Sequence, residues 1–183
     1  MSEDSRTRPP RPEMSDTTPP PVKAPPKAPA AIATTRVLLL VSFVAGFVVI
    51  MFAFLSRNTR VEELRTFVTD FDADADSAAI DTTANVLFWA TLGVLTAVIV
   101  IEALLLQAMM RRHGSGRWVL VFVVALHAAV ALFANELLTL GEDGLVIAIA
   151  LVAQLLLAGA ALLSAFMPGS WRWFRKRDDP AAA

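Results

Sequence analysis

Long runs of apolar residues, separated by short polar segments, dominate the sequence after its first 36 residues. Four of these runs approach the roughly 20 residues that a helix needs to cross about 30 Å of hydrocarbon. They lie at 37–55, 86–110, 118–138 and 145–167. Because a chain in lipid must satisfy its backbone hydrogen bonds within each segment, every run predicts a helix. The pattern predicts an all-α integral membrane protein with a transmembrane domain over 36–168.

Short polar turns join the second span to the third and the third to the fourth, at 111–117 and 139–144. Short connections place consecutive helices antiparallel and side by side. We therefore expect the four transmembrane helices to form an antiparallel bundle.

The segment between the first two spans is longer and carries its own helical signals. Thr59 and Glu62 fit a capping box, in which each side chain bonds the other's backbone. Apolar residues then recur at helical spacing, at Val61, Leu64, Val68 and Phe71. This predicts a short amphipathic helix over 59–71, on the outer membrane surface or against a partner. Asp81 and the two threonines after it predict the cap of the second span's helix.

The first 35 residues hold nine of the chain's eleven prolines, mixed with Ser, Thr, Ala and charged residues. Such a segment cannot bury enough apolar surface to offset its ordering entropy, so 1–35 is predicted to be a disordered tail of polyproline-II character. Two P-x-x-P matches, starting at Pro9 and Pro26, suit either a docking peptide or a flexible tether, and we favour the tether.

Basic residues are distributed unevenly around the spans. Thirteen of the sixteen lie in the N-terminal tail, the 111–117 turn and the C-terminal tail, and three lie in the loop after the first span. Since Arg and Lys accumulate in cytoplasmic loops, both termini are predicted to be cytoplasmic. Arg greatly outnumbers Lys, a usage typical of GC-rich bacteria, so we expect a multi-pass protein of a bacterial inner (plasma) membrane.

The composition narrows the chemistry. The chain of 183 residues is 56% hydrophobic and 18% charged and contains no cysteine, which excludes disulfides, thiolate metal sites and thiol lipidation. It has no Walker loop, no G-x-S-x-G, no H-E-x-x-H and no basic–aromatic nucleic-acid platform. We expect no enzymatic activity, no cofactor and no nucleic-acid partner.

Glu102 is an acidic residue inside the second span. A charge there costs roughly 2.5–3.5 kcal/mol, so it needs a partner. His127 lies as far beyond the centre of the 111–117 turn as Glu102 lies before it, which puts the two at about the same depth, with Gln154 near that layer. The group indicates a proton relay or ion pathway, a contact with another subunit, or a buried hydrogen bond that fixes helix register. We favour the last.

Two other binding sites do not fit the residues. A bis-His haem needs two imidazoles at depth, and His113 lies in the cytoplasmic turn. The aspartates of the outer loop match no EF-hand register, because the required Gly and Glu are missing. We interpret them as a solvated acidic surface that can meet a basic partner. This surface comprises Asp70, Asp72, Asp74, Asp76, Glu142 and Asp143.

The C-terminal tail, 169–183, is aromatic and basic. Indoles suit the headgroup level and cations suit an anionic leaflet, so we expect this cytoplasmic tail to bind anionic membrane lipids; docking onto a partner is the alternative. The residues are Trp171, Arg172, Trp173, Phe174, Arg175, Lys176 and Arg177.

Small residues spaced four apart recur within the spans and predict close helix packing, some of it with another subunit. The pairs are Ser42 and Gly46, Gly93 and Ala97, Ala125 and Ala129, and Ala161 and Ala165.

The proline-rich tail, the acidic loop after the first span and the aromatic–basic ending over 168–175 together resemble small four-span membrane proteins of actinobacteria. Among them, the layout looks like the LucB-like accessory subunits of the mycobacterial mammalian-cell-entry (Mce) lipid importer. That resemblance implies a permease-associated role in fatty-acid or sterol uptake, with other membrane protein subunits as partners and no catalytic residues.

We therefore predict a non-enzymatic accessory or scaffold subunit of a larger cell-envelope complex, with Mce-type lipid import as the first candidate. A small homo-oligomeric transporter or channel using Glu102 and His127 is the first alternative. An accessory subunit of a respiratory supercomplex, which has a similar general shape, is the second.

Overall fold

The computed structural model describes residues 28–111, 115–141 and 144–170, and its regular secondary structure there is helical throughout. Five helices follow in chain order: α1 Ala30–Leu55, α2 Arg57–Phe71, α3 Ser77–Met110, α4 Gly116–Leu138 and α5 Gly144–Ala165. Four of them (α1, α3, α4 and α5) are long and apolar enough to cross a membrane. The prediction of an all-α chain with four such helices is confirmed.

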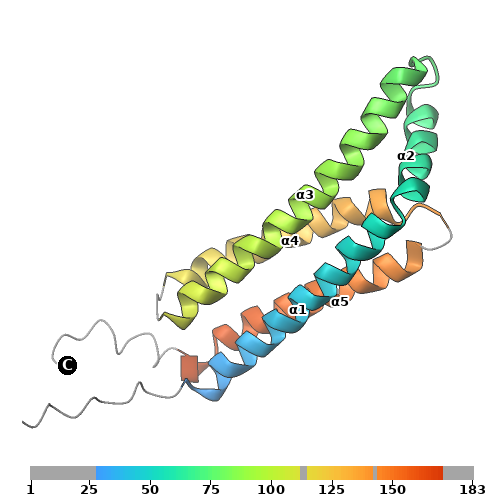
Figure 1. Cartoon of the computed structure of the whole chain (residues 1–183). Helices are drawn as coiled ribbons and strands as arrows, with labels where there is room; N and C mark the ends of the chain where they lie inside the picture. Colours follow the sequence, from blue (N-terminus) through green and yellow to red (C-terminus); the bar gives the residue numbers. More distant parts are fainter. Residues whose placement is uncertain (1–27, 112–114, 142–143, 171–183) are drawn as a thin grey trace, which may run out of the picture.

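The four long helices pack as an up-down-up-down bundle in which α1 contacts α3 and α5, and α4 contacts α3 and α5 (Figure 1). The pairing of α1 with α5 is the most extensive. One end of the bundle, called the tail end here, carries the start of α1, the end of α5 and the α3–α4 turn. The opposite end, called the loop end, carries α2 and the α4–α5 turn.

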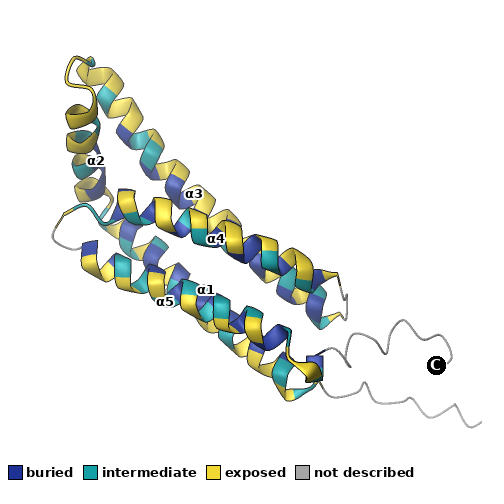
Figure 2. Cartoon of the chain, turned by 180° about the vertical axis from the view of Figure 1, so that it is seen from behind, coloured by how far each residue is buried: buried dark blue, intermediate teal, exposed yellow. Residues whose placement is uncertain are grey.

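The buried face of each long helix is a narrow stripe. In α1 the buried residues alternate in steps of three and four, and α5 repeats the same rhythm. An average spacing of 3.5 residues is that of helices packed knobs-into-holes at a small crossing angle. The opposite faces stay exposed (Figure 2), and only 28–33% of each apolar span is buried within the chain. Most of each span is therefore free to contact lipid or another protein.

The buried apolar residues form two clusters along the bundle axis. The loop-end cluster draws on all five helices and includes Val49, Leu64, Phe88, Leu137 and Leu151. The tail-end cluster draws on the four long helices. It comprises Ile32, Leu39, Leu106, Met109, Leu120, Val124, Ala158, Ala161 and Ala165. The core is thus interrupted midway, where polar residues take the inward positions.

Helix α1 starts at Ala30, so 30–35, which we predicted to belong to the disordered tail, is helical. Residues 30–33 are Ala-rich and follow the last proline of the tail, so nothing there stops a helix. Ile32 is buried, and the Thr35 hydroxyl lies 2.7 Å from that of Ser164 on α5. Tertiary packing therefore extends the first helix beyond its hydrophobic run. Residues 1–27 of the predicted tail lie outside the described part.

The amphipathic helix predicted at 59–71 exists as α2, but the predicted capping box is wrong. The position before α2 is Ser56, and no side chain caps the helix. Only Ser56 separates the end of α1 from the start of α2, and its hydroxyl donates backward to the Phe52 carbonyl at 2.8 Å. Thr59 lies inside the helix, and the Glu62 carboxylate pairs with Arg65 instead.

Helix α3 starts at Ser77, so the predicted cap at Asp81 is wrong as well. Its hydroxyl and amide side chains bond backward along the helix: Thr82 donates to the Ala78 carbonyl at 2.8 Å and Asn85 to the Asp81 carbonyl at 2.9 Å. The first turns of α3 extend past the bundle beside α2, and the two form a helical hairpin at the loop end (Figure 1).

Candidate functional site

A layer of polar side chains lies between the two apolar clusters, and each long helix contributes one of them. Ser42 comes from α1, Glu102 from α3, His127 from α4 and Gln154 from α5. Three of the four are 0% exposed and Gln154 is 1% exposed. We call these four residues the polar layer. It places the three residues singled out from the sequence at one level of the bundle, together with a serine that the sequence analysis had noted only as a small residue.

The structure brings Glu102 and His127 into direct contact. His127 Nδ1 lies 2.8 Å from Glu102 Oε1. The second atom of each group, Glu102 Oε2 and His127 Nε2, is buried without a hydrogen-bond partner. A lone polar group in such surroundings is costly, so each of the two side chains depends on the other for its hydrogen bond.

Gln154 belongs to the layer but does not bond to the pair. Its backbone carbonyl accepts a 3.0 Å hydrogen bond from the Ser42 hydroxyl, and its side-chain Nε2 has no partner. A Cβ at Gly46 would lie 2.5 Å from Gln154 Nε2 and 2.6 Å from Ile99 Cδ1. The absence of a side chain at Gly46 therefore lets α3 and α5 both press against α1 beside the polar layer.

The small-residue pairs divide into two kinds. Ser42 with Gly46 and Ala161 with Ala165 are buried, and they line the interface between α1 and α5. The pairs on α3 and α4, which begin at Gly93 and Ala125, are exposed on the outside of the bundle. Half of the predicted close-packing signals thus serve the chain's own core, and half lie on its surface.

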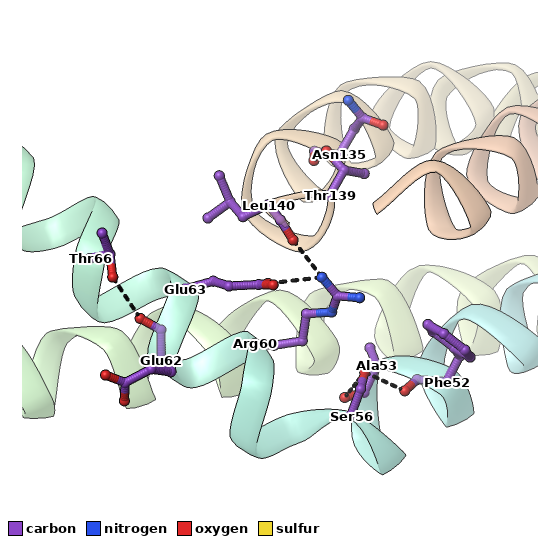
Figure 3. Close-up of polar contacts among 10 residues, drawn as sticks. All are labelled: Phe52, Ala53, Ser56, Arg60, Glu62, Glu63, Thr66, Asn135, Thr139 and Leu140. Carbon is purple, nitrogen blue, oxygen red and sulfur yellow. Dashed lines mark hydrogen bonds and ion pairs between the residues drawn. The ribbon is translucent and has the colours of Figure 1, made fainter. Parts of the chain in front are cut away.

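Sequence reasoning missed a second buried polar contact at the loop end. Arg60 of α2 is 1% exposed, and its Nη1 donates to Glu63 Oε2 at 2.8 Å and to the Leu140 carbonyl of the α4–α5 turn (Figure 3). Glu63 in turn presses on Gly141, whose φ of 86° suits glycine. We call Arg60, Glu63 and the Leu140 carbonyl the latch, because they fasten α2 to the α4–α5 turn.

The α2–α3 hairpin has its own ion pairs further out. Arg65 lies 2.8 Å from Glu62 and 2.9 Å from Asp81 of α3. The hydrogen bond that Arg65 donates to Glu62, and then the charge of Asp81, raise the pKa of Arg65 above its ordinary value. The Arg65–Asp81 pair joins α2 to α3, whereas the Arg65–Glu62 pair lies within α2. These groups are well exposed, so both pairs add little stability.

The remaining predicted site residues do not join these contacts. Asp70, Asp72, Asp74 and Asp76 are exposed at and beyond the end of α2. The other two acidic-surface residues (Glu142, Asp143) and the whole aromatic–basic set (Trp171, Arg172, Trp173, Phe174, Arg175, Lys176, Arg177) lie outside the described residues. No protein-family model, curated protein or solved structure matches this chain.

Proposed function

We propose that this chain is a non-enzymatic accessory subunit of a larger cell-envelope membrane complex. The observation that carries this proposal is a contrast between its interior and its surface. The ionisable groups at depth, Glu102 and His127, are fully buried and bonded to each other, whereas only 28–33% of each span is buried within the chain and much of the α2–α3 hairpin is exposed.

The burial of the polar layer favours a structural role for it. A proton or ion pathway needs access from both membrane faces, and apolar clusters lie on both sides of this layer. A hydrogen bond between side chains of neighbouring helices instead fixes how the helices meet. Glu102 and His127 join α3 to α4, and Ser42 joins α1 to α5, so the layer ties two helix pairs at one level.

The exposed surface favours assembly with other proteins. A single four-helix unit needs no small-residue stripe on its outer side, yet Gly93 and Ala125 start such stripes on α3 and α4. The hairpin adds exposed aromatic residues outside the bundle, with Phe71 at 87% exposure. Surfaces of this kind serve a subunit better than a self-contained catalyst.

Within this class, an Mce-type lipid importer for fatty acids or sterols is the first candidate, supported by the whole-chain layout described above. In that setting the termini face the cytoplasm of a bacterial inner membrane, the basic ending contacts anionic lipids, and the loop-end hairpin faces outward.

A homo-oligomeric transporter is the second candidate, because one observation favours it. Glu102 Oε2, His127 Nε2 and Gln154 Nε2 are all buried without hydrogen-bond partners. Unpaired polar atoms at one depth of the bundle could hydrogen-bond a transient chain of water molecules that conducts protons.

Purification of the native chain from its own membrane in mild detergent tests the proposal. A subunit should co-purify with another integral membrane protein in fixed stoichiometry, and its reconstitution alone into liposomes should give no ion or proton flux. Recovery of this chain alone in every mild detergent would overturn the subunit role. Flux that disappears in Glu102→Gln would establish the transporter.

Uptake measurements test lipid import separately from the subunit role. Deletion of the gene should lower uptake of radiolabelled fatty acid or sterol, and the intact gene should restore it. Unchanged uptake with intact co-purification would refute lipid import and leave the subunit role standing.

A further inference from the structure

The α2–α3 hairpin carries an apolar groove on one side. A cavity of about 380 Å³ opens between the two helices. Phe67, Val68 and Phe71 line it from α2, and Ala79, Ile80 and Leu87 line it from α3. Since Leu87 lies in the first turn of the predicted second span and Ala79 two turns before it, the groove runs about 12 Å outward from the edge of the bundle.

The groove is not filled by the chain itself. Phe67 is 43% exposed and Phe71 is 87% exposed, so the largest side chains on its α2 wall present their rings outward. The hairpin around them is mostly exposed (Figure 2). Clustered aromatic rings in this setting mark an interaction surface more than isolated exposed residues do.

The rim of the groove is strongly acidic. Asp72 lines it directly, and Asp70, Asp74 and Asp76 flank it on the same short segment. These four aspartates have no ion-pair partner within the described part of the chain. The nearby cation Arg65 is already shared between Glu62 and Asp81. A ligand that fits this groove therefore combines apolar bulk with positive charge.

On this basis we propose that the groove of the α2–α3 hairpin binds an amphipathic, basic helix of a partner protein. The apolar face of that helix lies against Phe67, Phe71 and Ile80, and its Lys or Arg residues face the four aspartates. Helix-in-groove recognition uses side chains spaced over two or three turns, which suits a groove of this length. The inference rests on the proposed subunit role and names the surface through which that role is exercised.

Charge decides against the two other occupants of an apolar groove. A second copy of this chain would bring its own four aspartates to the same place, and like charges juxtaposed in an interface cost affinity. Fatty acids and anionic lipids would place a negative headgroup at the same acidic rim. Of these occupants, the basic helix is the one that gains from both the apolar wall and the acidic rim of the groove.

A binding experiment with defined probes tests the pairing. The full chain is placed in phosphatidylcholine nanodiscs, and the probes are two helical peptides of about 18 residues with the same leucine face, one with lysines and one with glutamates on the other face. We expect the lysine peptide to bind chain-loaded discs about tenfold more tightly than empty discs, and the glutamate peptide to show no preference. Equal behaviour of the two peptides would overturn the proposal.

Variants localise the binding. Ile80→Asp in the groove wall should abolish the preference of the lysine peptide for loaded discs. Changing the four aspartates to asparagine should weaken its binding about tenfold and reduce its salt dependence. Thr66→Asp, at an exposed position of α2 that does not line the groove, is the control that should leave binding unchanged. If the control variant lost binding of the lysine peptide while Ile80→Asp retained it, the assignment of the site would be contradicted.

A photo-crosslinking amino acid at position 71 in the native membrane identifies the occupant. We expect an adduct with a basic amphipathic segment of another protein, absent when the same group replaces Phe122, which is 71% exposed on α4. A lipid adduct or a dimer of this chain at position 71 would overturn the groove assignment. In either case, co-purification of the unmodified chain with other subunits would show that the subunit role survives. Absence of co-purification would overturn both the subunit role and the groove proposal.

Discussion

The pair of Glu102 and His127 permits a double-mutant cycle that tests its structural role. Removing either side chain alone leaves the other buried without a partner among apolar residues. Because an unsatisfied buried polar group costs about 1–3 kcal/mol, we expect Glu102→Leu and His127→Leu each to lower the free energy of unfolding by about 2 kcal/mol. The double variant removes both groups together, and we expect it to lie within about 1 kcal/mol of the native chain.

The cycle then gives a coupling energy of about 3–5 kcal/mol between the two positions. That value exceeds the roughly 0.6 kcal/mol average of hydrogen bonds between membrane helices, because here each single variant leaves an ionisable group without its partner. Glu102→Gln should lower the free energy of unfolding by less than about 1 kcal/mol, because a side-chain amide can hydrogen-bond Nδ1 of His127 through either its oxygen or its nitrogen.

Reversible unfolding in lipid–detergent bicelles, titrated with dodecyl sulfate and followed by circular dichroism, measures all four corners of the cycle. Ser42→Ala is the matched control in the same layer. Its hydroxyl bonds the Gln154 backbone and not the pair, so its effect should add to that of Glu102→Leu. Additive single variants at Glu102 and His127, with a coupling below about 0.5 kcal/mol, would refute the view that the pair acts as one unit.

Three further changes test other parts of the structure by the same unfolding assay. Gly46→Ala should lower the free energy of unfolding by about 1–3 kcal/mol, because the new Cβ would lie 2.5 Å from Gln154 Nε2. Gly93→Ala has no atom within 4 Å of the new Cβ and should raise the free energy of unfolding by about 0.5–1 kcal/mol. Equal effects of the two variants would contradict the packing at Gly46. Arg60→Met should cost about 1–3 kcal/mol and speed amide exchange in the α4–α5 turn, and unchanged exchange would rule out the latch. Asp81→Asn, in an exposed ion pair, should change stability by less than about 1 kcal/mol, and a larger loss would mean that the hairpin depends on this pair.

Hydropathy predicts the spans well where the apolar run and the helix end together. The second predicted span ends at 110, and α3 ends at Met110. The third and fourth spans differ from α4 and α5 by at most two residues at either end. In each case a Gly-containing turn or a proline follows the last apolar residue, so the signal for crossing lipid and the signal for stopping a helix coincide.

Hydropathy fails where a helix continues beyond the lipid-compatible run. Ser77 starts α3 nine residues before the predicted span, and that polar segment is held by α2 through contacts such as the Arg65–Asp81 pair. Local cap signals mislead there, because Thr82 and Asn85 bond within the helix rather than at its start. No local pattern separates those two uses of the same side chains.

The candidate site also has one part that the sequence predicts and one part that it does not. Counting helical rise from the 111–117 turn is enough to bring Glu102 level with His127, because both helices are regular and share that turn. Arg60 contacts Leu140 across 80 residues of sequence, through a helix whose start the sequence misplaces. Its partner is a backbone carbonyl, which has no sequence signature. Contacts of this kind have to be seen in the folded chain.

The polar layer also explains how a core rich in small residues selects one arrangement. The buried stripes of α1 and α5 repeat every seven residues with small side chains at many positions, so sliding one helix by a heptad would bring comparable apolar groups together. The same shift between α3 and α4 would displace Glu102 from His127 by about 10 Å and leave the carboxyl in apolar surroundings. At roughly 2.5–3.5 kcal/mol, that mismatch disfavours the shifted register by about a hundredfold or more. A pair that adds little net stability can therefore still determine which bundle forms, and with it which helix faces remain outside for a partner.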